Sequence, residues 1–248
     1  MEKEFTFLMP CLNEERTLGD CIRTINKTIF EERLDAEVLV VDNGSTDNSV
    51  EIACSLGARV VQEDKKGYGN ALLKGIQEAK GKYIIMGDCD MSYDFSSVHA
   101  FIEYLRLGFD LVMGNRFAGG IEKGAMPWSH QYIGNPLISL VGRKICNSRI
   151  GDFCCGLRGF NTESIRKLHL RMPGMEFGVE MVVAAEKADY NTINTPIILH
   201  PDGRDRKPHL KTIKDGFRVF RYLFSTLDEI PIYSPLGDSF LFTPQIGG

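Results

Sequence analysis

The stretch Tyr83-Ile84-Ile85-Met86-Gly87-Asp88-Cys89-Asp90 is a short apolar run that ends in two carboxylates separated by one residue. A run of this length with this boundary predicts a buried strand of an α/β sheet. Such a strand would hold Asp88 and Asp90 at the mouth of the sheet, where a divalent cation and a diphosphate can meet. The alternative is an ordinary strand end followed by an acidic turn, and the motif alone is too weak to decide between them.

Strands and helices are predicted to alternate through residue 115, on both sides of this stretch. The predicted strands are residues 5–11, 36–41, 59–62, 82–87 and 110–114. The predicted helices lie between them, at 13–29, where apolar residues recur at helical spacing from Leu18 onward, and at 48–56, 71–79 and 96–107. This order is typical of a doubly wound, mostly parallel sheet, in which ligands bind beyond the carboxyl ends of the strands.

Polar side chains follow three of the predicted strands. These side chains are Asn13 and Glu14, then Asp42, then Asp88 and Asp90. Asn13 is a predicted helix N-cap, because its amide oxygen can accept a hydrogen bond from the first helical turn. One acid at a strand end is usually a cap, whereas acids at several strand ends that face one crevice predict a nucleotide-binding site.

The second half of the chain is less regular. Helices are predicted at 131–147, 162–168, 176–188 and 211–224, a strand at 192–199, and a return of the chain to the core at 152–160. The helix at 131–147 combines one apolar side with several cations. That side either faces the core or lies on a membrane or a lipid-binding groove, and the sequence leaves both readings open.

A basic segment contrasts with the formal net charge of −4. From Arg204 to Arg221 there are seven Lys or Arg residues against two acids. Such a run is usually a solvated face, but Arg and Lys beside a diphosphate site are what phosphate binding requires. The acidic balance of the whole chain argues against a general nucleic-acid-binding protein.

Length and composition set further limits. At 248 residues the chain can bury one large core with an elaborated second half. Its seven cysteines are odd in number and lack Cys-x-x-Cys spacing, which predicts reduced thiols in a cytoplasmic protein without a zinc site. No secretory signal is predicted, and no apolar run approaches the ~18 residues that are needed to cross a bilayer.

Taken in order, these motifs resemble those of family-two inverting glycosyltransferases with the GT-A fold. The resemblance is strongest to the branch of dolichyl-phosphate mannose synthase and the bacterial polyprenyl-phosphate glycosyltransferases. It extends from residue 5 to about residue 225. The stretches that carry it are residues 9–14, 41–47, 66–71, 87–94, 114–117, 152–160 and 203–211.

The resemblance implies a Rossmann-like GT-A domain over residues 1–226, with a nucleotide-sugar half at 1–115, an acceptor half at 116–226 and a tail at 227–248. The donor would be a nucleoside diphosphate sugar, with uridine or guanosine as its base. The residues implied to bind the donor are Pro10, Asn13, Glu14, Asp42, Gly67 and Asn70. Asp88 and Asp90 would hold Mg²⁺ or Mn²⁺. The cations implied to contact donor or acceptor phosphates are Arg116, Arg204, Arg206 and Lys211.

The acceptor decides which catalytic groups are needed. The resemblance favours undecaprenyl or dolichyl phosphate at a membrane surface, and a phosphate is already ionised and needs no strong base. A hydroxyl on a sugar, peptide or small molecule would need a general base. The candidate bases are Glu180, Glu176 and Asp152, beside Asp90 and Arg116 as further catalytic groups. A nucleotide-binding protein without transferase activity is the remaining alternative, and a homo-oligomer is left open.

Two features depart from the family pattern. Met91 follows Asp90 where an additional acid is frequent, so the metal site would have one outer ligand fewer. Many relatives continue into membrane-spanning helices, whereas residues 227–248 contain Pro231, Pro235 and Pro244 and are not expected to span. The chain would then dock peripherally on the cytoplasmic face of a membrane, use a soluble acceptor, or be a shortened form.

Overall fold

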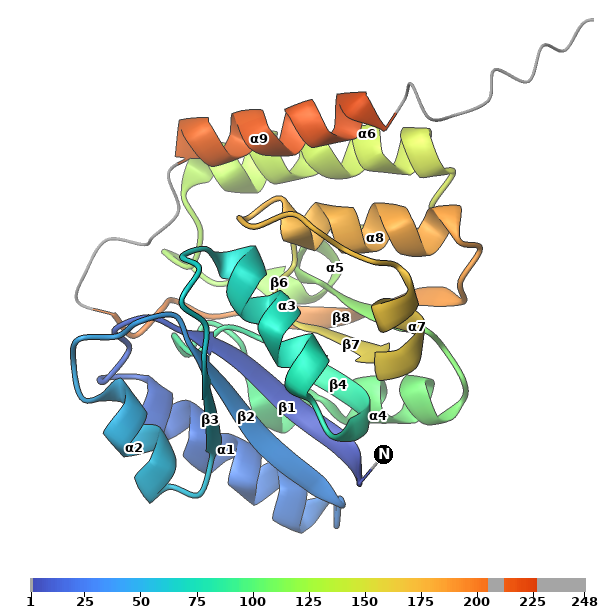
Figure 1. The fold of residues 1–248 in the computed structure, drawn as a ribbon. Helices are drawn as coiled ribbons and strands as arrows, with labels where there is room; N and C mark the ends of the chain where they lie inside the picture. Colours follow the sequence, from blue (N-terminus) through green and yellow to red (C-terminus); the bar gives the residue numbers. More distant parts are fainter. Residues whose placement is uncertain (1, 205–211, 227–248) are drawn as a thin grey trace, which may run out of the picture.

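A single eight-stranded sheet organises the protein (Figure 1), whose computed structural model describes residues 2–204 and 212–226. The strands are β1 (Lys3–Cys11), β2 (Ala36–Asp42), β3 (Arg59–Gln62), β4 (Gly81–Met86), β5 (Leu111–Asn115), β6 (Gly120–Ile121), β7 (Arg158–Asn161) and β8 (Thr192–Leu199). Their spatial order is β3-β2-β1-β4-β7-β5-β8-β6. All pairings between these strands are parallel except those of β7, which runs antiparallel to both β4 and β5.

Helices cover both faces of this sheet. They are α1 (Leu18–Glu31), α2 (Ser49–Ser55), α3 (Tyr68–Glu78), α4 (His99–Arg106), α5 (Arg116–Gly119), α6 (Asn135–Cys146), α7 (Thr162–Lys167), α8 (Phe177–Lys187) and α9 (Thr212–Ser225). A short 3₁₀ helix, η1 (Phe95–Ser97), precedes α4, and a π-helical turn, η2 (His130–Gly134), precedes α6. Figure 1 shows α8, α6 and α9 stacked in succession away from the sheet, and α6 contacts both of the others.

The central strand β1 shows how sequence produces these layers. Its residues Phe5, Phe7, Leu8 and Met9 are fully buried, as expected for a parallel strand that is covered on both faces. The ring of Phe7 contacts that of Phe95 in η1, with centroids 6.4 Å apart. Leu8, on the opposite face, packs against α3, where any side chain at Gly75 would collide with it. Alternation along the strand therefore fills two separate hydrophobic layers.

The carboxyl ends of the parallel strands meet at one edge of the sheet. Cys11 at the end of β1 is aligned with Asp42 at the end of β2, and β4 ends directly before the Gly87-Asp88-Cys89-Asp90 turn. Asn115 ends β5 and is aligned with Pro196 in β8. This edge therefore gathers the polar residues that the sequence places after its strands.

The structure confirms the predicted α/β architecture and corrects two local expectations. Asn13 does not cap the first helix: its φ is 57°, and α1 begins at Leu18, four residues after the expected first helical residue, with Thr17 at the N-cap. The reason is a tertiary contact, because the side chain of Asn13 accepts a hydrogen bond from the backbone N–H of Thr46. The segment predicted only to return to the core contains β7, which lies between β4 and β5.

Membrane-spanning helices are not found in the described part of the chain. No helix there is both long and apolar enough to cross a bilayer.

Candidate active site

Two carboxylates follow β4 at the centre of the carboxyl-end edge. Asp88 is half-buried, and its Oδ1 accepts a hydrogen bond of 2.9 Å from the hydroxyl of Tyr68, the first residue of α3. Asp90 is buried, and its Oδ1 accepts hydrogen bonds from the N–H and the hydroxyl of Ser92, at 3.0 and 2.6 Å. Loss of hydration, together with the negative charge of Asp90, raises the pKa of Asp88 to about 6. A bound cation that neutralised the two carboxylates would therefore lower the pKa of Asp88.

Arg204 supplies a cation to this cluster from the loop after β8. Its Nη2 lies 2.7 Å from Asp90 Oδ2 and 3.0 Å from Asp202 Oδ2, and its Nη1 lies 3.4 Å from Glu14 Oε1. One guanidinium thus faces carboxylates from the ends of β1, β4 and β8. Its Nε is buried and has no hydrogen-bond partner among the described residues, so these contacts leave one donor of the group unused.

The cluster suits a divalent cation that is shared with a substrate. Carboxylate oxygens are ligands that Mg²⁺ and Mn²⁺ prefer, and Mg²⁺ is usually bound through one or two carboxylates plus substrate phosphates. Asp88 and Asp90 provide two such groups, and a guanidinium already lies against one of them. Within residues 2–204 and 212–226, no group of three or more His, Cys, Asp or Glu side chains forms a metal cage. Diphosphate oxygens and water would have to complete the coordination.

The loop after β2 packs against the residues that follow β1. The carboxylate of Asp42 accepts hydrogen bonds from the N–H groups of Gly44 and Ser45, at 3.2 and 3.0 Å. Asn13 donates its own N–H to Ser45 Oγ at 2.8 Å and accepts from the N–H of Thr46 at 2.7 Å. Asp42 thus orders its own loop, and Asn13 fastens that loop to the residues after β1, beside the acidic pair.

Pro10 and Glu14 lie at the same strand end. Pro10 is aligned with Val41 inside the paired part of β1, and its carbonyl accepts a 3.1 Å hydrogen bond from Cys89 Sγ. Glu14 is buried, and its backbone N–H donates to Ser49 Oγ at 2.8 Å. Its carboxylate accepts from the Thr17 hydroxyl through Oε2 and faces Arg204 through Oε1, each at 3.4 Å.

Gly67 and Asn70 lie where α3 meets the loop before α8. The N–H groups of Gly69 and Asn70 donate to the carbonyl of Pro173, at 3.0 and 3.3 Å. Gly67 has a φ of 142°, and a side chain there would come within 2.2 Å of that same carbonyl. Only glycine can therefore bring the start of α3 so close to this loop.

Glu180 holds the other side of the same loop. Its Oε1 and Oε2 accept hydrogen bonds from the N–H groups of Arg171 and Met172, at 2.9 and 2.8 Å. Burial raises the pKa of Glu180, although these two N–H groups oppose the effect. Glu176, one turn earlier, is buried and pairs with Arg218 of α9 through Oε1. Its Oε2 has no hydrogen-bond partner in the part of the chain that the structure describes.

Arg116 and Asp152 form a buried pair at the end of β5. Arg116 Nε lies 2.6 Å from Asp152 Oδ2, and its Nη2 lies 2.9 Å from Oδ1, which is a bidentate arrangement. The side chain of Asp152 is fully buried, and its Oδ1 also accepts from the N–H of Cys154. The structure does not bring this pair into hydrogen-bond contact with Asp88 or Asp90. Strand β7 lies between β4 and β5, so the strands that precede the two clusters are two strand spacings apart, about 10 Å.

Three further residues shape the site without having been singled out in the sequence. Tyr68 donates to Asp88, and burial and the charge of Asp88 raise its pKa, which keeps the hydroxyl protonated. Gly156 leaves room for Asp88, because a side chain there would come within 2.8 Å of Asp88 Oδ2. Both residues lie in stretches that carry the family resemblance, which is the sequence signal that points to them.

Two of the cations implied by the resemblance, Arg206 and Lys211, lie outside the described residues.

Arg158 is the third such residue. It is fully buried, and within the described chain no carboxylate lies within ion-pair distance of it. Its Nη1 donates to the carbonyl of Gly178 at 2.8 Å, and its Nη2 donates to that of Cys155. Its positive charge lowers the pKa of Asp88 and so partly offsets the effect of Asp90.

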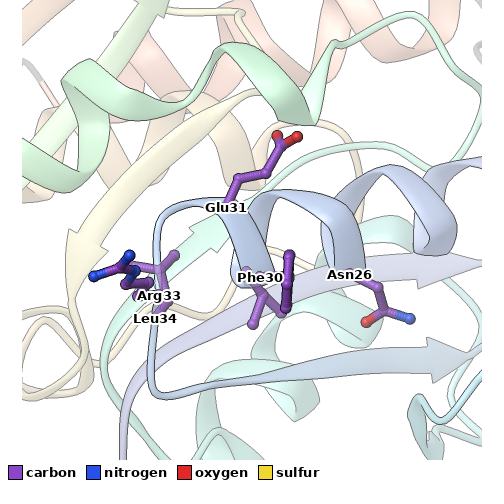
Figure 2. A pocket seen from close by; sticks show the side chains of 6 residues that line it. Asn26, Phe30, Glu31, Arg33 and Leu34 are labelled. Carbon is purple, nitrogen blue, oxygen red and sulfur yellow. The ribbon is translucent and has the colours of Figure 1, made fainter.

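The described surface also has hollows apart from these clusters. One of about 580 Å³ lies at the C-terminal end of α1, and Figure 2 shows that its lining side chains come from this helix end and the following turn. It lies at the edge where β2 begins, opposite to the strand ends that carry the acids. Another, of about 420 Å³, is lined partly by Met91, His200 and Gly203. Only this second hollow borders the loop of Asp90.

Comparison with known proteins adds the family. The sequence profile of glycosyl transferase family 2 matches residues 6–169. The low-salt glycan biosynthesis hexosyltransferase Agl6 of Haloferax volcanii is 35% identical over 217 residues, which cover 87% of this chain and 52% of Agl6. The chain thus spans about half the length of that relative.

Two further relatives come from the same organism. Glycosyltransferase AglJ of Haloferax volcanii is 32% identical over 220 residues, covering 88% of this chain and 70% of AglJ. A dolichyl-phosphate hexose transferase of Haloferax volcanii is 28% identical over 199 residues, covering 78% of this chain and 84% of that protein.

Solved structures share the fold. Glucosyl-3-phosphoglycerate synthase from Mycobacterium tuberculosis, in complex with phosphoglyceric acid, superposes with a TM-score of 0.73 at 21% identity, over 93% of this chain and 82% of that one. The same synthase with Mn²⁺ and uridine-diphosphate-glucose gives a TM-score of 0.69 at 18% identity, over 93% and 81%. These likenesses confirm the predicted GT-A arrangement of sheet and helices.

Proposed function

Since this chain belongs to glycosyl transferase family 2, we propose that it transfers a sugar from a nucleoside diphosphate sugar to the phosphate of a polyprenyl lipid, with inversion at the anomeric carbon. The observation that carries the proposal is the cluster of Asp88, Asp90 and Arg204 at the carboxyl ends of the strands. It places two carboxylates and a guanidinium where a diphosphate and its cation can be bound together.

The donor would lie across the ends of β1, β2 and β4. Asn13, which fastens the loop after β2, and Asp42, which orders that loop, would border the base and ribose. Glu14 and Pro10 would lie beside them. Uridine and guanosine both remain candidate bases. UDP-sugars are the first to test, because the synthase of similar fold was crystallised with uridine-diphosphate-glucose.

Asp88 and Asp90 would hold Mg²⁺ or Mn²⁺ on the donor diphosphate. When bound, the ion would neutralise the charge that develops on the leaving group. Arg204 would share this task, because its guanidinium can turn from carboxylates to phosphate oxygens, for which its geometry is equally suited. Tyr68 would keep Asp88 ionised and oriented through its hydroxyl.

The transfer itself needs no proton removal when the acceptor is a phosphate. An oxygen of the acceptor phosphate attacks the anomeric carbon, and the bond from that carbon to the diphosphate breaks with its electron pair leaving on the diphosphate. Two of the three candidate bases have both carboxylate oxygens engaged: Asp152 by Arg116 and Glu180 by two backbone N–H groups. We infer that both are positioning residues, and this supports an acceptor that is already ionised.

A hydroxyl-bearing acceptor is the second candidate. The buried Oε2 of Glu176, which lacks a described hydrogen-bond partner, is the observation that favours it, because an unsatisfied carboxylate oxygen can accept a proton. The relative that is a dolichyl-phosphate hexose transferase supports the lipid phosphate instead.

Transfer assays with labelled UDP- and GDP-sugars and Mn²⁺ test the proposal. The acceptors would be dolichyl phosphate, undecaprenyl phosphate, simple sugars and phosphoglycerate. We expect label in the organic phase with a lipid phosphate only, and an inverted anomeric configuration in the product. Transfer to a hydroxyl acceptor alone would refute the lipid-phosphate proposal and would not contradict the proposed donor site.

A further inference from the structure

Five large apolar side chains lie exposed on and just before η2 and α6. We call them the η2–α6 stripe: Trp128 (66% exposed), Tyr132 (60%), Ile133 (52%), Leu137 (44%) and Leu140 (44%). Steps of four, one, four and three residues place them on one face of a helix. The rings of Trp128 and Tyr132 contact each other, with centroids 5.7 Å apart. They make up five of the twelve exposed large apolar side chains of the described residues, so the stripe is a concentrated patch.

The opposite face of α6 is fixed to the protein. Ile138, Ser139 and Gly142 are buried. Ser139 Oγ accepts a 3.1 Å hydrogen bond from the N–H of Phe153, and a side chain at Gly142 would come within 2.6 Å of the Phe153 ring. The helix therefore cannot rotate to bury the stripe, which stays directed outward.

The segment that carries the stripe has charges of one sign, between Glu122 and Asp152 at its two ends. Residues 123–151 contain no Asp or Glu, although the whole chain has more acids than Lys and Arg. Four basic side chains in this segment are exposed: Lys123, Arg143, Lys144 and Arg149. Arg143 and Lys144 directly follow the apolar residues along α6. Exposed aromatic and aliphatic side chains with Lys and Arg at their margin are the composition of helices that lie in a membrane interface.

The stripe begins next to the candidate active site. His130, the first residue of η2, is partly buried, and this burial and the charge of Arg116 lower the pKa of its imidazole. Phe153, on which α6 is anchored, directly follows Asp152, the partner of Arg116. The outer surface of α6 is thus tied to the acceptor side of the site by consecutive residues.

We propose that the η2–α6 stripe is a docking surface for the interface of an anionic lipid bilayer. The inference rests on the proposed function, because it supplies the surface from which a membrane-embedded lipid phosphate reaches the site. The aromatic and aliphatic side chains enter the interfacial region, and Arg143 and Lys144 contact anionic headgroups. The helix lies on the bilayer and does not cross it.

A second copy of the chain fits the same surface less well. A two-fold contact would place the stripe against itself, and Arg143 and Lys144 would find no acid on the facing segment, since residues 123–151 carry none. Anionic headgroups match this charge, whereas another copy repels it.

The chain offers a built-in probe, because Trp128 is its single tryptophan. We would add the full chain to vesicles of phosphatidylcholine alone and of phosphatidylcholine with 30% phosphatidylglycerol, and record tryptophan emission and co-flotation. We expect a blue shift and flotation with the anionic vesicles, both weakened by 0.5 M NaCl. Emission that does not change with either vesicle, in protein that fails to float, overturns the inference.

Two double variants separate the parts of the surface. Leu137→Gln with Leu140→Gln should weaken vesicle partitioning about tenfold or more. Arg143→Gln with Lys144→Gln should weaken it about 30-fold at low salt, on the scale of one cationic contact each. The control is Phe30→Ser with Leu107→Ser, which removes two apolar side chains elsewhere that are even more exposed, at 84% and 74%, and should leave partitioning unchanged. Equal losses in the control would overturn the assignment to the stripe.

Activity assays test the docking surface separately from the proposed function. With a short-chain, water-soluble polyprenyl phosphate the stripe variants should retain wild-type rates, and with acceptor in vesicles they should lose rate in proportion to binding. Vesicle binding without transfer to any lipid phosphate would sink the proposed function and leave the docking surface standing. Sedimentation equilibrium that shows a dimer dissolved by Leu137→Gln, with no vesicle binding, would assign the stripe to a second copy instead.

Discussion

The guanidinium of Arg204 lies 2.7 Å from the carboxylate of Asp90, the acid that a divalent ion at this site would require. Both side chains are largely buried, so the contact is not a screened surface pair. Arg204 and a metal ion would therefore compete for the same oxygen, and a donor diphosphate would resolve the competition by offering oxygens to both.

Substituting Arg204 should tighten metal binding and weaken donor binding. In Arg204→Gln we expect Mn²⁺ affinity without donor to rise about tenfold, since a charge-assisted contact with Asp90 is lost. Affinity for the nucleoside diphosphate should fall. Mn²⁺ titration by electron paramagnetic resonance measures the first, and calorimetry the second. Arg59→Gln, which removes the partner of Glu37 at the start of β3, is the matched control. Unchanged Mn²⁺ affinity in Arg204→Gln would show that the two cations do not compete.

Neutralising either acid of the pair should abolish metal-dependent donor binding. Asp88→Asn and Asp90→Asn should each lower transfer by roughly 10²-fold or more, because charge on the leaving group is no longer offset. Thermal unfolding should show a folded protein in both cases. Variants that still bind donor in a Mn²⁺-dependent manner would contradict the assignment of these acids and favour a nucleotide-binding protein of another kind.

Metal affinity should depend on pH near 6. The metal-free pKa of Asp88 is about 6, raised by burial and by Asp90, so below pH 6 the ion must displace a proton and its apparent affinity should fall about tenfold per pH unit. The stability of the metal-free protein should change with pH in the opposite direction. The folded chain binds this proton more tightly than the unfolded chain, so the ionised Asp88 lowers the free energy of unfolding above pH 6, and this loss disappears as the pH falls. Mn²⁺ titrations between pH 5 and 8 measure the midpoint. Tyr68→Phe should move it upward, because the Tyr68 hydroxyl lowers this pKa; a midpoint that stays in place would contradict that role.

A methyl group at Gly156 should disturb the metal site more than the fold. In Gly156→Ala the new atom would lie within 2.8 Å of Asp88 Oδ2 and 2.9 Å of the Tyr93 ring. We expect weaker Mn²⁺ binding and a loss of about 1–3 kcal/mol in unfolding free energy. Gly216→Ala has no atom within 4 Å of the added methyl and serves as control for both measurements. Wild-type Mn²⁺ affinity in Gly156→Ala would show that Asp88 has room to move.

The Arg116–Asp152 pair should behave as a structural unit. Asp152→Ala leaves a buried guanidinium without its partner and should cost about 3–5 kcal/mol of unfolding free energy. The double variant Arg116→Met with Asp152→Leu should lose less stability than this single variant, because no isolated charge remains. Chemical denaturation measures both. If Asp152→Asn keeps its stability yet loses activity only toward hydroxyl acceptors, Asp152 is a base and the lipid-phosphate proposal loses its support.

Most elements could be predicted because each carries its own pattern. The apolar runs of β1, β2 and β4 and the helical spacing from Leu18 onward are local signals, and the structure confirms them. Strand β7 could not be predicted in this way: it has four residues, one of them Gly159, and it is extended because β4 and β5 bond to its two edges. The predicted N-cap role of Asn13 was wrong for a similar reason, since its hydrogen-bond partner Thr46 belongs to another loop.

The candidate site shows the same difference between local sequence signals and tertiary contacts. Acids at strand ends could be predicted to converge, and the structure brings Glu14, Asp88 and Asp90 to one edge with Arg204 facing them. Partners that depend on packing could not be foreseen. In the sequence, the residue types of Tyr68 and Gly156 do not by themselves indicate that both contact Asp88. The engagement of Glu180 by the loop before α8 likewise follows from tertiary structure.

The position of β7 has a consequence for how the chain is made. Strands β4 and β5 are complete by Asn115, yet they are not neighbours in the sheet. The strand that pairs with both of them, Arg158–Asn161, follows later in the chain, and β8, the other neighbour of β5, follows later still. During synthesis, the block β3-β2-β1-β4 therefore has an open edge at β4, and β5 has no neighbouring strand; such unpaired edges are prone to bind other chains. Insertion of β7 joins β5 to this block and sets the spacing between the strands that carry the acidic pair and Arg116 in one event. A nascent chain halted before Arg158 would therefore be a substrate for chaperones and not a smaller enzyme.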